Sequence, residues 1–189
     1  MQAQKLQVKF FANAEISETA LVPVFHDWIR ERVVPDELLI DVADYSHVPD
    51  GPGVMIIGHH ADYAVDRDNA RQGFTYSRKR LAEGEFEARV EDTFRRALRS
   101  CVRLEGQAGL NARFGTGEVI FRIQDRLLAP NDEATAAAVR PALEKTLQKL
   151  YPGQTAKIES VGAPREPLTL RITVASSDGA KDLLSRIDA

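Results

Sequence analysis

The residues of this chain that could do chemistry gather between positions 41 and 63. This stretch holds three of the four histidines together with aspartates and tyrosines, namely Asp41, Asp44, Tyr45, His47, His59, His60, Asp62 and Tyr63. A carboxylate beside an imidazole can hold the ring in one tautomer and raise its basicity, which suits proton transfer or metal binding. The stretch is therefore the first place to look for an active site.

Whether Asp41 meets a histidine depends on a predicted hairpin. Two apolar runs, at 37–45 and 53–59, flank the sequence Pro49-Asp50-Gly51-Pro52, whose prolines and glycine favour a turn. If the chain turns about residues 50 and 51, Asp41 stands opposite His59 or His60. The candidate catalytic residues are Asp41, His59, Tyr63 and Arg78. The candidate ligand-binding residues are Asp44, Tyr45, His47, His60, Tyr76 and Arg80.

A structural role for the same polar cluster is the alternative. Cross-strand contacts among Asp, His and Tyr are common at strand ends. Adjacent residues on a strand point to opposite faces, so we do not expect His59 and His60 to share a ligand. We therefore predict neither a metal site nor a bound cofactor.

A second concentration of charge begins with the basic run Arg78-Lys79-Arg80. Further arginines follow along the chain at positions 89, 96, 99 and 103. Such a run can hold a phosphate or a nucleic-acid backbone. Acidic residues at 83, 85, 87, 91 and 92 interleave with it, however, and mixed charges opposite an apolar stripe are typical of a solvated helix face. Because the net charge is −3, nucleic acid is not an expected partner.

The composition is that of a globular domain. The 189 residues are 43% hydrophobic and 28% charged, close to the averages of folded proteins. The single cysteine, Cys101, excludes an internal disulfide and lies on a predicted apolar stripe, where we expect it to be buried. The chain lacks the pattern of a secretory signal and any apolar run of the roughly 20 residues that span a bilayer. We expect one cytoplasmic domain, 1–189, without a membrane partner.

The elements that must position these residues follow the order strand, helix, strand, strand, helix twice. Apolar residues every fourth position predict a helix at about 19–33, and similar stripes predict helices at about 85–105 and 132–151. A short closing helix is expected after Asp178. Strands are predicted at 5–11, 37–45, 53–59, 118–128, 156–161 and 168–175. A more polar hairpin at about 63–78 has no counterpart in the second half, which makes it a place where function could have been added.

The two halves align at a single ungapped offset. The offset pairs Pro23 with Pro141 and Pro49 with Pro167, and it superimposes the apolar stripes of two helices. We therefore predict an α+β fold of duplicated β-α-β-β-α units, ferredoxin-like halves at about 5–105 and 117–188. Their first strands would pair antiparallel in one mainly antiparallel, six-stranded sheet, with the helices packed on one face. The alternative is that two amphipathic helices of similar length align by chance.

A resemblance extends over nearly the whole chain. The run Glu37 to Tyr63, ELLIDVADYSHVPDGPGVMIIGHHADY, together with Arg126 to Asn131, RLLAPN, resembles a family of small bacterial proteins that has no assigned function. The resemblance implies no activity, cofactor or substrate.

We expect a binding or interaction protein whose open sheet face or inserted hairpin accepts a small molecule or a protein, a second copy of the chain included. The alternative is an enzyme in which Asp41 and His59 act as an acid–base pair, assisted by Tyr63 or Arg78, in chemistry such as hydrolysis.

Overall fold

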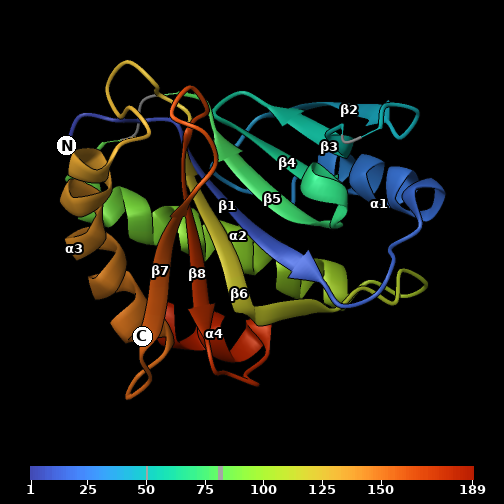
Figure 1. Cartoon of the computed structure of the whole chain (residues 1–189). Coiled ribbons are helices and arrows are strands. Elements are labelled where there is room, and N and C mark those ends of the chain that lie inside the picture. The colour runs from blue at the N-terminus through green and yellow to red at the C-terminus, as the bar shows by residue number, and fades with distance from the viewer. Residues whose placement is uncertain (50, 81–82) are drawn as a thin grey trace.

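The computed structural model describes residues 1–49, 51–80 and 83–189, which form one antiparallel sheet with helices on a single face (Figure 1). The strands are β1 Leu6–Ala12, β2 Leu39–Tyr45, β3 Gly53–Gly58, β4 Ala61–Asp66, β5 Gly73–Arg78, β6 Phe114–Ile123, β7 Ala156–Val161 and β8 Leu168–Val174. The helices are α1 Glu18–Arg30, α2 Phe86–Glu105, α3 Glu133–Leu150 and α4 Ala180–Ile187, with a short 3-10 turn at Asp68–Ala70. The α+β class and the antiparallel sheet are confirmed.

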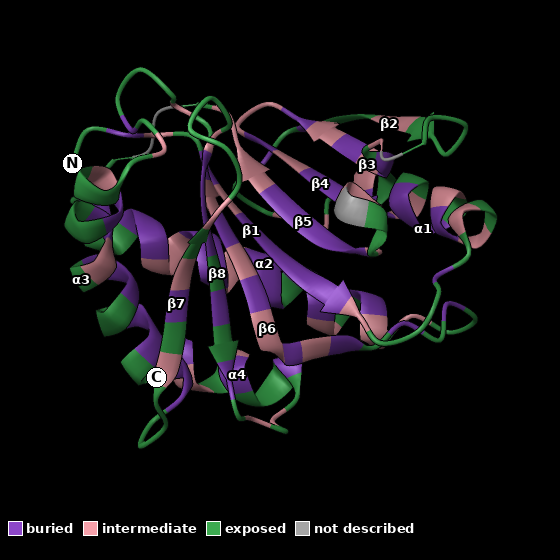
Figure 2. Cartoon of the chain, in the orientation of Figure 1, coloured by how far each residue is buried: buried purple, intermediate pink, exposed green. Residues whose placement is uncertain are grey.

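The core lies between the sheet and the helices (Figure 2). Alternation along β1 buries Leu6, Val8 and Phe10 completely, as a strand with one apolar face requires. The ring of Phe10 meets that of Phe94 on α2 edge-on, with centroids 6.4 Å apart. The predicted stripe of α2 is confirmed, because each of its members is buried: Phe86, Val90, Phe94, Leu98 and Cys101. No helix in the described ranges combines the length and the apolar character that a bilayer crossing requires.

The predicted hairpin at 63–78 is formed by β4 and β5, and it lies within the sheet. The strand order is β2-β3-β4-β5-β1-β6-β8-β7, so the sheet has eight strands and the six-stranded expectation is wrong. One face of the hairpin is apolar, and its residues Tyr63, Val65, Phe74 and Tyr76 are at most 1% exposed. Because the hairpin lies inside the sheet, the helices can cover this face. The expected antiparallel contact between the strands near 5–11 and 118–128 is present as the β1–β6 pair.

The inserted hairpin sets α1 apart from α2. Helix α1 covers β2 and β3, whereas α2 covers β5 and β1 and makes its main helix contacts with α3 and α4. The centres of these two strand pairs are three strand spacings apart, which is about 14 Å. Packed helices lie only about 8–10 Å apart. The helix layer is therefore interrupted over β4, where large side chains and the 31–38 segment have to fill the space.

Helix α1 ends earlier than its apolar stripe predicts. The backbone N–H of Glu31 donates to the carbonyl of Asp27, and Arg32 then takes a left-handed conformation with a φ of 50°. Pro35 disfavours helical backbone at the residue before it. Val33, predicted as the last member of the stripe, therefore leaves the helix with the segment that leads to β2.

The register of β2 with β3 also differs from the prediction. Asp41 stands opposite Ile57, and Tyr45 stands opposite Gly53, which centres the turn near residue 49. A bulge between Leu39 and Asp41 shifts the pairing further. Asp50, a member of the predicted turn, lies outside the described residues.

Two boundaries in the second half differ from their predictions. Strand β6 starts at Phe114 and stops at Ile123, because the following loop is held by Asp125, whose carboxylate accepts the backbone N–H groups of Gln4 and Lys5. Helix α4 begins after Gly179 rather than Asp178. The Asp178 carboxylate instead accepts a hydrogen bond from Arg186 at 2.8 Å.

The attachment of the inserted hairpin to β1 can be tested at Gly73. A Cβ there would lie 2.5 Å from the carbonyl oxygen of Phe10, so Gly73→Ala forces two paired strands apart. We predict that this change lowers the free energy of unfolding by about 1–3 kcal/mol in urea denaturation. The control is Gly106→Ala at the end of α2, where the nearest atoms are 3.6 Å away and the change should stay within about 0.5 kcal/mol. Equal unfolding midpoints for the two variants would contradict the prediction.

Candidate functional site

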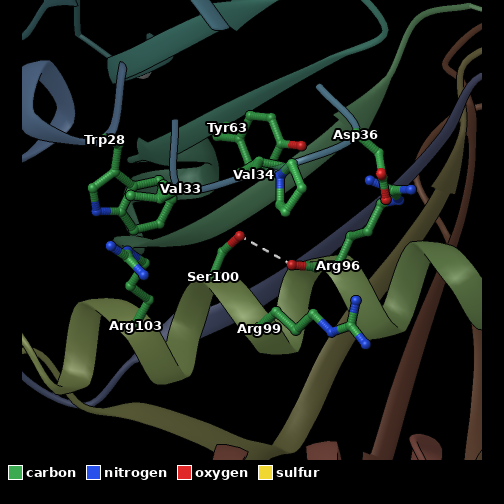
Figure 3. A pocket seen from close by; sticks show the side chains of 10 residues that line it. Trp28, Val33, Val34, Asp36, Tyr63, Arg96, Arg99, Ser100 and Arg103 are labelled. Carbon is green, nitrogen blue, oxygen red and sulfur yellow. Dashed lines mark hydrogen bonds between the residues drawn. The ribbon is translucent and has the colours of Figure 1, made fainter. Parts of the chain in front are cut away.

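A pocket opens between α1 and α2, at the place where the helix layer is interrupted (Figure 3). Its cavity volume is about 90 Å³, so it has room for no more than a small ligand. Its lining comes from α1, the segment after α1, β4 and α2: Trp28, Val33, Val34, Pro35, Asp36, Tyr63, Arg96, Arg99, Ser100 and Arg103. The pocket thus lies where β4 separates the strands covered by α1 from those covered by α2.

Tyr63 places a buried hydroxyl in this pocket. The residue is 1% exposed, and its hydroxyl has no hydrogen-bond partner of normal geometry among the described residues. Figure 3 shows the hydroxyl pointing to the side where Asp36 and the Arg96 guanidinium lie. Burial raises the pKa of Tyr63 well above its ordinary value, and neighbouring Tyr76 and Glu37 act in the same direction, against Arg96. The hydroxyl therefore stays protonated and can donate a hydrogen bond.

Arg96 is the most enclosed of the three pocket arginines. Its Nε donates to Asp92 Oδ2 at 2.8 Å, one helical turn earlier, and the Asp92 carboxylate also accepts from Arg78 Nη1 at 3.4 Å. Burial opposes the charge of Arg96, but the hydrogen bond and the negative charge of Asp92 outweigh it and raise the pKa of the guanidinium. Arg96 is thus a fixed cation held in one orientation.

The other two arginines stand nearer the mouth of the pocket. Arg99 Nη2 donates to Asp188 at 3.0 Å, and its side chain is 57% exposed. The guanidinium of Arg103 lies 5.8 Å from the centre of the Trp28 ring and 3.7 Å from a carboxylate oxygen of Glu31. Both side chains give the mouth a positive character, while Asp36 contributes one negative charge there.

Trp28 closes one end of the pocket. It is the single tryptophan of the chain, is 3% exposed, and packs its ring against that of Phe25 at 5.5 Å. Its indole N–H has no hydrogen-bond partner among the described residues. An unpaired buried donor costs about 1–3 kcal/mol, so a ligand with acceptor atoms would be stabilised by Trp28 and Tyr63.

A second cationic depression lies on the open face of the sheet, but the protein itself uses its donors. Lys9 is 4% exposed and forms an ion pair with Asp66, and its ammonium group also donates to the carbonyl of Arg71 at 2.8 Å. Arg71 donates to both carboxylate oxygens of Glu118 at 2.9 Å. These contacts fasten the 67–72 loop across the sheet, which is a structural role.

Three of the predicted site residues belong to the pocket or to its support. Tyr63 lines the cavity, and Tyr76 packs edge-on against it across the β4–β5 pair, with centroids 5.3 Å apart. Arg78 lies within 3.5 Å of the Tyr76 hydroxyl and shares Asp92 with Arg96. The structure thus brings together the candidate site residues that lie on the β4–β5 hairpin.

Asp41 and His59 do not form the predicted pair. Asp41 Oδ1 accepts a hydrogen bond from the backbone of Val42, and the residue opposite Asp41 is Ile57. The backbone N–H of His59 donates to Leu38, and its ring meets that of His60 edge-on at 4.6 Å. The shifted turn explains the error, because it leaves both histidines in the bend that follows β3.

The other candidates have structural contacts of their own. Hydrogen bonds from Ser46 hold the pKa of Asp44 below its usual value at the tip of the β2–β3 hairpin, where the rings of Tyr45 and His47 stack at 6.4 Å. Arg80 Nε donates to the carbonyl of His59 at 2.9 Å. The backbone N–H of His60 donates at 2.7 Å to the buried carboxylate of Glu37. These contacts order turns and do not bring the candidates into the pocket.

Sequence reasoning assigned the pocket arginines to a solvated helix face. Positions 96, 99 and 103 recur at the spacing of one helix flank, which is a signal that the three side chains lie side by side. The sequence gives no sign that the neighbouring helix stands away from this flank.

Metal chemistry and thiol chemistry find no support at this site. In the part of the chain that the structure describes, no group of three or more His, Cys, Asp or Glu side chains is arranged to hold a metal ion. Cys101 is buried on α2 as predicted, and burial raises the pKa of its thiol well above the ordinary value.

The buried tyrosine pair gives a prediction for alkaline pH. Burial raises the pKa of Tyr76 from 10.0 to about 12. Because this pKa is higher in the folded state, the contribution of the neutral phenol to stability is fully present below pH 10 and is lost as the pH rises towards 12. We expect the free energy of unfolding to fall more steeply over this range in the native protein than in Tyr76→Phe, as measured by urea denaturation. Identical slopes would show that Tyr76 ionises as freely as in the unfolded chain.

The chain was compared with models of known protein families and with curated proteins, and no match was found in either comparison. The resemblance of residues 37–63 and 126–131 to a small bacterial family therefore stays a prediction, and the site rests on its own geometry.

Proposed function

We propose that the protein binds a small organic anion in the pocket between α1 and α2. The observation that carries this proposal is the presence in one cavity of a cation, Arg96, and of the buried Tyr63 hydroxyl, which interacts with that guanidinium without a hydrogen bond of normal geometry. An anionic oxygen placed between them would accept charge-assisted hydrogen bonds, which are about twice as strong as neutral ones. The apolar side chains of Val33, Val34 and Pro35 would cover the rest of the ligand.

The origin of the pocket supports a role in function. The 63–78 hairpin was predicted as a place where function could have been added, and its Tyr63 and Tyr76 supply the inner wall and its support. If stability alone shaped this region, apolar side chains filling the space would give a more stable fold than a cavity with cationic walls. The cavity is therefore better explained by ligand binding.

We also propose that the chain arose by duplication of a ferredoxin-like unit. The series β1, α1, β2, β3 has the same order as β6, α3, β7, β8. In the sheet, the strands of the second series have the order β6-β8-β7. The strands of the first series have the equivalent order β1-β3-β2 if β4 and β5, which lie between β1 and β3, are left out of the comparison. The antiparallel β1–β6 contact supports a local twofold relation between the halves.

The alternative of an enzyme with an Asp41–His59 pair has no geometric support. Arg78 borders a depression with Gln7 and Asp62, whereas His59 borders another with Gln4 and Arg80. Asp41 is exposed on β2 and bonds to its own backbone neighbour. Convergence in one cavity, which acid–base catalysis requires, is therefore missing for this set of described residues.

The single tryptophan allows a direct test of the proposal. Because Trp28 lines the pocket, we expect its fluorescence to change saturably on titration with at least one member of a panel of aromatic and aliphatic carboxylates and phosphate esters. Arg96→Gln should weaken that binding about tenfold or more, since a hydrogen bond to a charged group contributes about 1.5–3 kcal/mol. Arg171→Gln, on the open face, is the matched control and should leave the affinity unchanged.

A native mass spectrum of the purified chain complements the titration. We propose that the protein is cytoplasmic and assembles as a homodimer. The mass spectrum reports both the number of subunits and any small molecule that stays bound. The binding proposal fails if no panel member produces a saturable change and the spectrum contains no bound anion.

A further inference from the structure

We infer that the pocket selects a ligand with a single carboxylate on a flat apolar body, and that Asp92 is the positioning residue behind this selectivity. The inference rests on the proposed function, since it names the class of organic anion. It separates a carboxylate, with one negative charge, from a phosphate monoester, which carries nearly two at neutral pH.

The charge of the pocket is the first reason. Every arginine in its lining already has a protein carboxylate: Arg96 has Asp92, Arg99 has Asp188 and Arg103 has Glu31. The Asp36 side chain at the mouth and the buried Glu37 near Tyr63 add further negative charge. A monoanion can share these partly compensated cations, whereas a dianion would meet repulsion from the carboxylates around it.

The geometry of Arg96 is the second reason. Its Nε donates to Asp92, so the guanidinium is held from one edge, and it also interacts with the Tyr63 hydroxyl. Two parallel N–H groups match the two oxygens of a planar carboxylate. The Tyr63 hydroxyl, on the same side of the pocket in Figure 3, can supply a further hydrogen bond to the same group.

The apolar wall is the third reason, and it concerns the body of the ligand. Val33 and Val34 lie on one side of the cavity, and the arginine-bearing flank of α2 lies on the other (Figure 3). Pro35 also belongs to the lining. Guanidinium groups stack on aromatic faces, as Arg103 does over Trp28. A flat ring can contact the apolar wall and a guanidinium at once, which a flexible chain does less well.

Matched pairs of probes test this inference. Benzoate is compared with phenyl phosphate, and hexanoate with hexyl phosphate, by the fluorescence of Trp28 at about pH 8, where the phosphate esters are dianions. We expect benzoate to bind at least tenfold tighter than phenyl phosphate and tighter than hexanoate. At about pH 5 phenyl phosphate becomes a monoanion while benzoate stays mostly ionised, and the difference within this pair should shrink.

The role of Asp92 is tested with Asp92→Asn, which removes one negative charge beside Arg96. The ratio of benzoate affinity to phenyl phosphate affinity should fall at least tenfold in this variant, a change of selectivity that a merely structural role would not produce. If circular dichroism shows that Asp92→Asn does not fold, Glu31→Gln is the second variant. It frees Arg103 at the mouth and should lower the same ratio by about threefold, which is about 0.6 kcal/mol.

The outcomes separate this inference from the proposed function. Tighter binding of phenyl phosphate than of benzoate would overturn the inference and leave an anion-binding pocket. If the ratio of benzoate affinity to phenyl phosphate affinity does not change in folded Asp92→Asn, the role of Asp92 is overturned. If it does not change in Glu31→Gln, the role of the paired carboxylates in general is overturned. Absence of saturable binding for all four probes and for the wider panel would overturn the proposed function itself.

Discussion

The place of β4 and β5 between β3 and β1 is the constraint on which the rest of the structure depends. Two additional strands widen the sheet beyond what adjacent helices can cover, so α1 and α2 cannot pack against each other there. Tyr63 and Tyr76 fill part of the space with rings that are at most 1% exposed. The remaining space is the pocket, whose walls come from elements that would otherwise be in contact.

The hairpin and helix α2 are joined by a shared carboxylate. Asp92 accepts from Arg78 at the end of β5 and from Arg96 on its own helix, so two cations balance one anion at this junction. The hydrogen bond from Arg96 to this carboxylate gives the guanidinium a fixed direction.

Periodicity in the sequence predicted most elements, because burial on one face is a local property of a helix or strand. It failed at the end of one helix, in the register of one turn and where distant contacts decide. The stripe of α1 continues to Val33, yet left-handed Arg32 ends the helix before that residue. The turn between β2 and β3 offered several registers, and the observed one pairs Tyr45 with Gly53. The spacing of the α2 arginines showed which flank they share, but only the width of the sheet determines that this flank is open to a cavity.

The chemistry of the pocket agrees with the proposed recognition of an anion. Its arginines are permanent cations, and the Tyr63 phenol is held in its protonated form by burial. The hydroxyl of Ser100 donates to the backbone carbonyl of Arg96 at 3.0 Å and so is not aligned with a base. The one carboxylate in the lining, that of Asp36, is exposed at the mouth. A site of this kind offers donors and fixed charge at its inner end, in agreement with the proposed retention of an anion.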